Sequence, residues 1–286
     1  MKTAIVTDST AYIPKELREK HHIHMIPLNV ILSGESYREE VDLQADEFFE
    51  EIKKEDKLPT TSQPSVGDLV ELYEKLANDY DAVISIHLSS GISGTYQGAI
   101  TAGGMVDGIE VYAYDSEISC MAQGFYVLEA AKMAAMAIDP SEIISRLDVM
   151  KESLRAYFMV DDLSHLQRGG RLSGAQAFIG SLLQVKPLLH FENKIIMPFE
   201  KIRTRKKAMK RIEELLGKDA ESGDEYQACI IHANRKEDAL EWKQEIEQKY
   251  PNVEMSISYF GPVIGTHLGE GAMGLTWVKN NLSVKH

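Results

Sequence analysis

The stretch HLSSGISGTYQGA, residues 87–99, joins a short apolar segment to an amphipathic one. Residues 82–88 are rich in apolar side chains and predict a strand, whereas residues 95–105 predict a helix. Gly91 and Gly94 lie at the turn between them, together with several hydroxyl side chains. A turn of this kind is typical of α/β folds with a parallel sheet.

The rest of the first half repeats this alternation of strand and helix. The pattern predicts a mainly parallel sheet with helices on both faces. Polar residues follow three strands, at Asp8, Ser89 and Asp115, and open parallel sheets bind ligands beyond these strand ends. The expected strands are residues 3–7, 23–32, 82–88 and 109–113, and the expected helices are residues 14–21, 43–54, 66–78, 95–105, 118–137 and 140–152.

The second half has a different pattern, which predicts an α+β sheet with helices on one side. The turn Glu192-Asn193 suggests an antiparallel hairpin between residues 185–191 and 194–202. We expect two domains, residues 1–155 and 156–286, with the glycine-rich segment 259–277 returning to a cleft. The remaining expected strands are residues 155–160, 226–233 and 253–260, and the expected helices are residues 162–167, 204–217 and 235–249.

Composition excludes several classes of function. The 286 residues include 31 Lys and Arg against 44 Asp and Glu, a net charge of −13, which repels the phosphates of nucleic acids. Cys120 and Cys229 lie far apart without a metal-binding spacing, as in a reduced, cytoplasmic protein. No apolar run approaches the ~20 residues of a membrane span. We expect no metal and no stable membrane insertion, and the composition allows transient membrane contact.

The glycine turn suits an anion. Backbone N–H groups at the start of a helix lack partners and carry partial positive charge, which favours a negatively charged ligand. Ser93 and Thr95 add hydroxyl donors, although Ser93 in the simpler interpretation only caps the helix. The lysine of a Walker A motif is absent, and Gly94 directly after Ser93 does not fit a nucleophile elbow.

Two other stretches carry candidate ligand residues. In TTSQPS, residues 60–65, Ser65 is the expected N-cap of the next helix, while Thr61 and Ser62 precede it as a loop of adjacent hydroxyls. That composition suits an anion and is equally ordinary for a turn. In the segment 259–277, His267 stands among glycines, which predicts an irregular backbone rather than a helix. Its ring can donate a hydrogen bond to an anion.

A local basic cluster interrupts the acidic sequence. Charged runs are usually solvated, but cations at the start of a helix oppose its dipole and favour an acidic partner or a phosphate. Arg168 and Arg171 can extend the cluster. The cluster consists of Lys201, Arg203, Arg205, Lys206, Lys207, Lys210 and Arg211.

The motifs TDS, TTSQPS, SSGISGTYQGA, LQRGGRLSG, VKPLL, IRTRKKA and GPVIGTHLGEGAMG occur in this order along the whole chain. As a set they resemble the DegV family of fatty-acid-binding proteins, which serve as a subunit of bacterial fatty acid kinase. The resemblance implies a long-chain fatty acid in a tunnel between the domains and no other cofactor. Its carboxylate would be bound by Thr61, Ser62, Ser93, Gly94 and His267.

The resemblance also implies a partner and a reaction. A separate ATP-dependent kinase would phosphorylate the bound acid, docking at Arg171, Arg203 and Arg205, and this chain would have no catalytic residue. It would then carry the acyl phosphate toward phospholipid synthesis. Apolar residues that either line the tunnel or belong to the ordinary core are Met121, Met133, Met136, Phe178, Ile179, Leu182 and Leu183.

Two alternatives remain open at this point. The first is a hydrolase of acyl esters, with Ser93 as nucleophile, His267 as base and Asp8 or Asp115 as its partner. The second is a binder of small phosphorylated ligands that uses the same glycine turns. The chemical nature of the bound ligand distinguishes both from a fatty-acid carrier.

Overall fold

The computed structural model describes residues 1–54, 57–172 and 186–280. The chain forms two compact units. The first comprises Met1–Glu152 and Gly261–Thr266, and the second comprises Ser153–Phe260 and His267–His286. In the described part of the chain, no helix has both the length and the apolar character that crossing a membrane requires.

The first unit contains a parallel sheet in the order β2-β1-β6-β7. Every residue of β1 and β6 is buried, because both faces of the sheet are covered. This burial explains why the sequence shows apolar runs here instead of alternation. The strands are β1 (Thr3–Asp8), β2 (Ile23–Ile26), β6 (Ala82–His87) and β7 (Glu110–Asp115).

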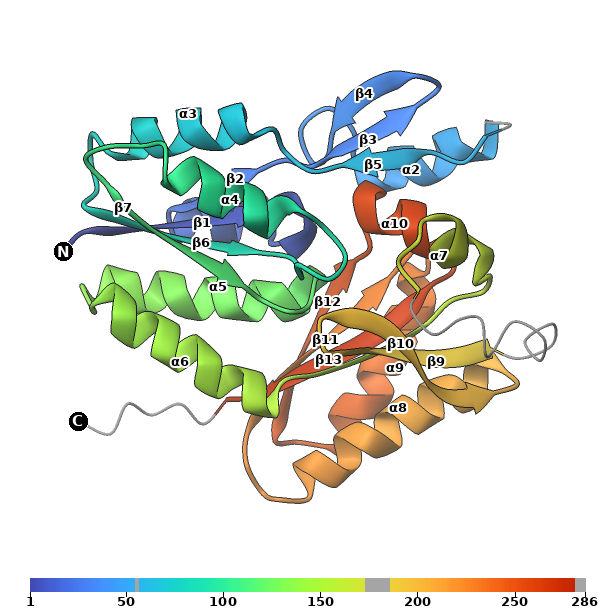
Figure 1. The fold of residues 1–286 in the computed structure, drawn as a ribbon. Coiled ribbons are helices and arrows are strands. Elements are labelled where there is room, and N and C mark those ends of the chain that lie inside the picture. The colour runs from blue at the N-terminus through green and yellow to red at the C-terminus, as the bar shows by residue number, and fades with distance from the viewer. Residues whose placement is uncertain (55–56, 173–185, 281–286) are drawn as a thin grey trace. The chain divides into compact units, whose positions relative to one another are not determined.

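Helices lie on both faces of this sheet (Figure 1), as the sequence predicted. Leu69 and Tyr73 of α3 pack on Val6 and Val83, whereas α5 contacts the opposite face. Ser65 caps α3 as predicted, since its Oγ accepts from the Asp68 amide at 3.0 Å. The helices are α1 (Lys15–Lys20), α3 (Val66–Leu76), α4 (Thr95–Gly103), α5 (Cys120–Ala135) and α6 (Pro140–Ser153).

A small antiparallel sheet, in the order β4-β3-β5, corrects two sequence predictions. Residues 23–32 form two strands in different sheets instead of one, because Pro27 cannot donate to a ladder and separates them. The segment 58–65 is not only a loop, since Thr60–Ser62 forms a strand. The elements are β3 (Asn29–Leu32), β4 (Glu35–Arg38), α2 (Ala45–Glu51), a 3₁₀ turn (Ile52–Lys54) and β5 (Thr60–Ser62).

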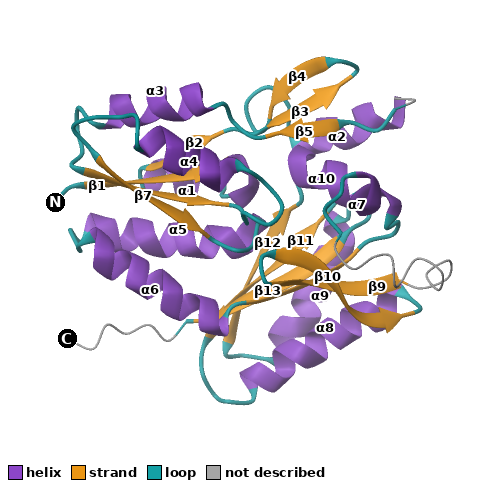
Figure 2. Ribbon diagram, viewed as in Figure 1, coloured by secondary structure: helices purple, strands orange, loops and turns teal. Residues whose placement is uncertain are grey.

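The second unit contains a mixed sheet in the order β10-β9-β8-β13-β11-β12 (Figure 2). Ile212 and Leu216 of α8 and Trp242 and Ile246 of α9 form its core with the sheet, and the predicted hairpin is present as β9 and β10. The elements are β8 (Arg155–Met159), α7 (Ser164–Arg168), β9 (Lys186–Glu192), β10 (Ile195–Ile202), α8 (Arg205–Ala220), β11 (Tyr226–His232), α9 (Lys236–Lys249), β12 (Val253–Tyr259), α10 (Pro262–Leu268) and β13 (Met273–Lys279).

The sequence did not predict two elements of the glycine-rich segment. β13 lies inside the sheet, between β8 and β11, and its nearly uniform burial removes the alternation that identifies a strand. A Cβ at Gly274 would lie 2.9 Å from the Phe158 Cβ, so only glycine allows β8 this close. His267 belongs to the helix α10, which makes the expected irregular backbone wrong.

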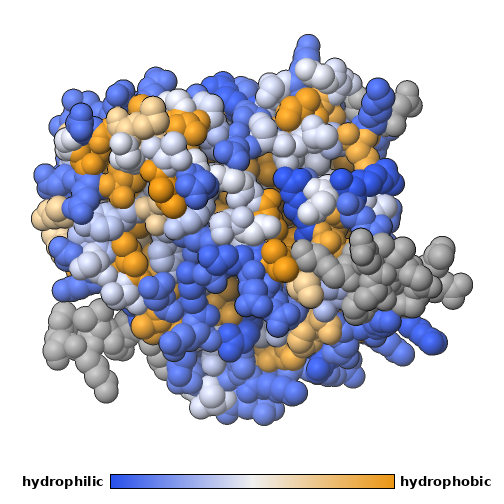
Figure 3. Space-filling view, in the orientation of Figure 1, coloured by the Kyte–Doolittle hydropathy of each residue, from blue (hydrophilic) through white to orange (hydrophobic). Residues whose placement is uncertain are grey.

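Hydrophilic residues dominate the face shown in Figure 3, with hydrophobic patches between them. Among the described residues, large exposed hydrophobic side chains include Met105 and Met136, each 63% exposed, and Phe199, 38% exposed. Met136 ends α5 in solvent, so it does not line a buried tunnel. Met121 and Met133 on the same helix are buried, whereas Phe178, Ile179, Leu182 and Leu183 lie outside the described residues.

Candidate functional site

The polar cluster at the end of β1 is closed by its own hydrogen bonds. Asp8 Oδ1 accepts from the Thr10 amide at 3.1 Å and from its hydroxyl at 2.6 Å. Asp8 Oδ2 accepts from the Leu88 amide at 2.9 Å and from Gln123 Nε2 at 3.2 Å, and lies 3.1 Å from His87 Nδ1. All five residues are buried. Asp8 therefore ties the ends of β1 and β6 together as a structural group.

In this cluster a serine, a histidine and an aspartate are linked one after another by hydrogen bonds. Ser85 Oγ lies 2.7 Å from His87 Nε2, and Tyr73 donates to Ser85 at 2.8 Å. Ser85 is fully buried, so a substrate has no access to it. Asp8 therefore partners His87 and not His267, which removes one carboxylate from the hydrolase hypothesis.

The second carboxylate of that hypothesis has structural partners too. Asp115 at the end of β7 accepts from the Ser90 hydroxyl at 2.5 Å and from the Ser90 and Glu117 amides at 3.1 and 3.0 Å. The carboxyl ends of β6 and β7 therefore lie side by side, as the sequence predicted. The two aspartates at this edge of the sheet are occupied in holding it together.

The start of α4 is more open. Gly94 is its N-cap residue and provides no capping side chain, and the first helical bond runs from the Gly98 amide to the Gly94 carbonyl at 2.9 Å. Ser93 Oγ contacts Thr95 Oγ1 at 2.9 Å and accepts only a long bond of 3.4 Å from the Thr95 amide. Ser93 is half-buried and Gly94 exposed. Capping alone thus does not account for Ser93, and the turn offers donors to an anion.

Gln63 joins the TTSQPS segment to this turn. A Cβ at Gly94 would lie 2.1 Å from Gln63 Oε1, so the amide side chain fills the place where a side chain at position 94 would be. Gln63 directly follows Thr61 and Ser62, two of the predicted ligand residues, which pair with β3. Both lie on β5, where successive side chains point to opposite faces, so the expected loop of adjacent hydroxyls is corrected.

The sequence offered one signal for Gln63 that was not used. It follows the two predicted ligand residues and precedes Pro64, and a long amide side chain at such a place can satisfy backbone groups on a neighbouring turn. Gly98 also lies beside it, since a Cβ there would be 3.5 Å from Gln63 Nε2. Gln63 is the residue that sequence reasoning missed in this region.

His267 lies in the second unit near the glycine-containing segment QRGGR, residues 167–171. A Cβ at Gly169 would lie 2.4 Å from His267 Nδ1, so the glycine backbone packs directly on the ring. Burial, together with the smaller effects of the nearby Arg171 and His165, lowers the pKa of His267 to about 4. The ring is therefore neutral near pH 7, so it can donate a hydrogen bond to an anion but does not attract one by positive charge.

The three predicted docking arginines have different surroundings. The guanidinium of Arg171 donates to the carbonyl of Gly169, the residue that packs on the His267 ring. Arg205 pairs with Asp161 at 2.7 Å and donates to the Gly271 carbonyl at 2.6 Å, so it stabilises the second unit itself. Arg203 is exposed, just before Thr204, which caps α8.

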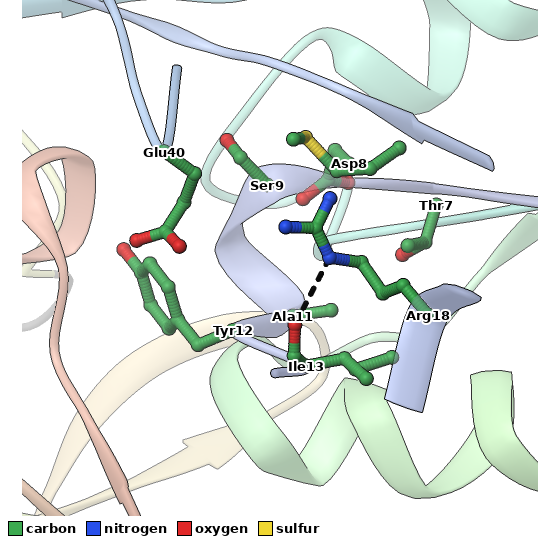
Figure 4. Close-up of a pocket in the computed structure, with 9 residues that line it drawn as sticks. Thr7, Asp8, Ser9, Ala11, Tyr12, Ile13, Arg18 and Glu40 are labelled. Atoms are coloured by element: carbon green, nitrogen blue, oxygen red, sulfur yellow. Dashed lines mark hydrogen bonds between the residues drawn. The ribbon is translucent and has the colours of Figure 1, made fainter. Parts of the chain in front are cut away.

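A groove of about 390 Å³ between α8 and α9 includes part of the basic cluster. Its α8 wall carries Arg205, Lys206 and Lys210, and its α9 wall carries Glu241 and Glu245. The charges of the two walls compensate each other, so the groove as a whole does not attract an anion. A smaller cavity of about 10 Å³ lies beside Asp8, Tyr12 and Arg18 (Figure 4), where it suits about one water molecule and no acyl chain.

Comparisons with known proteins agree with this architecture. The model of the DegV family, described as an uncharacterised protein family, matches residues 2–280. The fold is that of an α/β protein, and the chain belongs to the DegV family. Protein DegV of Bacillus subtilis is 64% identical over 278 residues, which cover 97% of this chain and 99% of that relative.

Solved structures extend the comparison. The crystal structure of DegV from B. subtilis, described as a fatty acid binding protein, matches with a TM-score of 0.94 over 98% of this chain and 99% of that one. A DegV family protein from Thermus thermophilus, described by its fatty acid binding, is 30% identical with a TM-score of 0.92 over 98% and 100% of the chains. A stearic-acid-binding protein from Eubacterium ventriosum is 26% identical, with a TM-score of 0.88 over 97% and 98%.

Proposed function

We propose that this protein binds a long-chain fatty acid and holds its carboxylate with Ser93, Gly94, His267 and one of the two adjacent β5 residues Thr61 and Ser62, whose side chains point to opposite faces. The observation that carries the proposal is the start of α4, where Gln63 packs on Gly94 and the N-cap residue provides no capping side chain. Relatives at 64% and 30% identity are described as fatty acid binding proteins, which supports the same ligand here.

The energetics suit this division of labour. Burial of each methylene group is worth ~0.8 kcal/mol, so a chain of about fifteen provides ~12 kcal/mol before entropy losses. A carboxylate without partners would cancel much of this gain. Charge-assisted hydrogen bonds from amides, hydroxyls and the neutral His267 ring offset that cost. The acyl chain supplies affinity, and the polar group fixes which end of the ligand lies at α4.

The direct test identifies the ligand that co-purifies with the protein and then removes two of its contacts. Native mass spectrometry should show a long-chain acid, and Ser93→Ala combined with His267→Ala should lower affinity for oleic acid by about tenfold or more. The fold should remain intact, because neither side chain belongs to a core cluster. A phosphorylated polar ligand, or ester hydrolysis that Ser93→Ala abolishes, would contradict the proposal.

The protein is further proposed to present the carboxylate to a separate ATP-dependent kinase. The kinase would transfer the γ-phosphoryl group to a carboxylate oxygen, which yields an acyl phosphate and ADP, and this chain would carry the product toward phospholipid synthesis. Arg203 is the best docking candidate, because it is exposed at the start of α8, whereas Arg205 pairs with Asp161.

A matched pair of charge reversals tests the docking. Arg203→Glu should slow phosphorylation of the bound acid while the affinity for oleic acid stays unchanged. Lys218→Glu, which makes the same charge change at the exposed far end of α8, is the control and should have no effect on phosphorylation. Equal rates for both variants would exclude Arg203 from the docking surface.

A further inference from the structure

Glu39 is a buried carboxylate that the proposed function does not yet use. It follows β4, where its backbone amide donates to the Leu28 carbonyl at 2.9 Å, and its side chain is inaccessible to solvent. A buried carboxyl group persists in a fold only where hydrogen-bond donors surround it. The donors around Glu39 come from two distant parts of the first unit.

Three donors converge on this carboxyl group. The Ser9 hydroxyl lies 2.5 Å from Oε2, and the Tyr12 hydroxyl and the Val263 amide lie 2.8 and 2.7 Å from Oε1. Ser9 Oγ accepts from the Leu28 amide, and Tyr12 Oη accepts from the Ile264 amide at 3.3 Å, so each hydroxyl directs its own proton to Glu39. Glu39 thus acts as an acceptor for all three groups.

Two of these interactions satisfy the start of α10. The amides of Val263 and Ile264 lie in its first turn, where a helix leaves N–H groups without internal partners. Glu39 accepts from the first, and Tyr12, oriented by Glu39, accepts from the second. When it is ionised, the carboxyl group in this place also interacts favourably with the helix dipole. Glu39 performs the task of a capping residue from a distant position in the sequence.

The start of α10 also has no spare room around this anchor. A Cβ at Gly261 would lie 2.3 Å from Tyr12 Cε1 and 3.1 Å from Glu39 Oε1. A Cβ at Gly265 would lie 3.0 Å from the Phe49 ring. The backbone of α10 therefore packs directly on the residues that hold it.

A helix as short as α10 depends on such support. It has seven residues, among them Gly265 and three β-branched residues, and isolated helices of this length are unstable in water. Its last turn contains His267, the proposed donor to the fatty-acid carboxylate. A displacement of its first turn moves the whole helix, because no further turn absorbs the change.

We propose that Glu39 is a positioning residue for the carboxylate site: by holding the amides of Val263 and Ile264, it sets the place of the helix that carries His267. This inference rests on the proposed function. Glu39 itself does not touch the ligand. Burial raises the pKa of Glu39 to about 8, against the lowering effect of Ser9, Val263 and Tyr12.

Titratable neighbours bear on how Glu39 responds to pH. Glu40 beside it in sequence adds a further raising effect, and Tyr12 has a pKa raised well above its usual value by burial and then by Glu39 and Cys120. The segment of α10 that packs on Glu39, residues 262–266, contains no titratable side chain. Among these neighbouring groups, Glu39 is therefore the one that we expect to lose its proton near pH 8.

The experiment compares Glu39→Gln with Glu35→Gln. Glu35 is the matched control, because it lies on the same hairpin and is exposed. It accepts a hydrogen bond from Tyr37 at 2.8 Å, within its own strand and not from α10. In ligand-free protein, hydrogen exchange of the amides of residues 261–268 should become about tenfold faster in Glu39→Gln. Glu35→Gln should exchange like the wild type.

Oleic acid serves as the probe for the site. Its dissociation constant should rise by about tenfold in Glu39→Gln above about pH 8, where the wild-type carboxyl group is ionised. The gap between wild type and this variant should widen as the pH rises through about 8, because glutamine cannot ionise and accepts more weakly from the Val263 amide. A loss of stability alone would not produce this pH profile. If Glu39→Gln does not fold, Tyr12→Phe tests the same anchor, since it removes the acceptor of the Ile264 amide.

Two results overturn the inference. Unchanged hydrogen exchange in residues 261–268, or equal affinity of wild type and Glu39→Gln at every pH, shows that Glu39 does not position α10. A wild-type protein that binds no fatty acid instead contradicts the proposed function, and with it any site to position. The two failures are therefore distinguishable.

Discussion

The end of β1 and the start of α4 are built from the same kinds of residue, but their polar groups are used in opposite ways. At the end of β1, Asp8 accepts hydrogen bonds from Thr10, Leu88 and Gln123, and every member is buried. At the start of α4, Ser93 is half-buried and Gly94 is an N-cap without a capping side chain. The first cluster is saturated and holds the fold, while the second still offers donors to a ligand.

This difference teaches that residue type does not identify a site. Ser and Thr follow both strands, and both clusters lie at the carboxyl edge of one parallel sheet. What separates them is whether the protein itself supplies every partner. His267 resembles the second cluster, because its half-buried ring lies near the positive charge of Arg171 and suits a negatively charged ligand.

The largest expected effect comes from opening the saturated cluster. Asp8→Ala should lower the free energy of unfolding by about 3–5 kcal/mol, because it leaves His87 and the Leu88 amide buried without their acceptor. Denaturant unfolding measures this loss. The control Asp107→Ala removes an exposed aspartate and should change stability by less than about 0.5 kcal/mol. Similar stabilities of the two variants would break the comparison.

A smaller effect is expected from pH at His267. Its folded-state pKa of about 4 lies below the ordinary value of 6.5, so the neutral ring contributes stability above pH 6.5 that is lost as the pH falls toward 4. Relative to His267→Gln, the wild type should lose up to about 1.4 kcal/mol of unfolding free energy per pH unit in this window.

Denaturant unfolding at a series of pH values measures that difference, and the subtraction removes the other titrating groups. Parallel profiles of wild type and His267→Gln would show that the ring is not buried beside a positive charge. A bound fatty acid should raise the pKa of His267, because a negative charge near the ring favours its protonated form.

The smallest effect is expected from a methyl group at the open turn. Gly94→Ala places a Cβ where Gln63 Oε1 now lies, so the amide must move away from the turn and affinity for oleic acid should fall by about tenfold. Gly98→Ala is the matched control, since its Cβ would meet Gln63 and Leu69 at ordinary distances of 3.5 and 3.6 Å.

The control variant should bind oleic acid like the wild type. It should also be more stable by about 0.5–1 kcal/mol, because alanine is favoured over glycine inside a helix. Isothermal titration measures both affinities. Equal loss of affinity in Gly94→Ala and Gly98→Ala would mean that Gln63 does not organise the turn.

Local patterns predicted much of the first unit and little of the final segment. β1, β6 and α3 follow directly from apolar runs and a capping serine. β13 escaped prediction because it is almost uniformly buried and contains Gly274, and β5 because its three residues are hydroxylic. α10 escaped because Glu39, its distant cap, contributes nothing to its local sequence.

The candidate site divides in the same way. Glycines, hydroxyls and one histidine were visible as anion-binding chemistry, because their donors are properties of single residues and short turns. Three pairings were not visible in the sequence: Gln63 packs on Gly94, Asp8 bonds to His87, and Arg205 pairs with Asp161. Each pairing joins residues far apart in the chain.

From the sequence alone follow the α/β class, the strands of the parallel sheet and the helices of the first half, the acidic character and the residue types able to hold a carboxylate. Periodicity, composition and turn chemistry are local properties, so they can be recognised from the order of residues along the chain. Only the tertiary structure decided which polar groups are already satisfied and which remain for a ligand. Hydrogen-bond saturation depends on partners that folding brings together, and no local pattern records them.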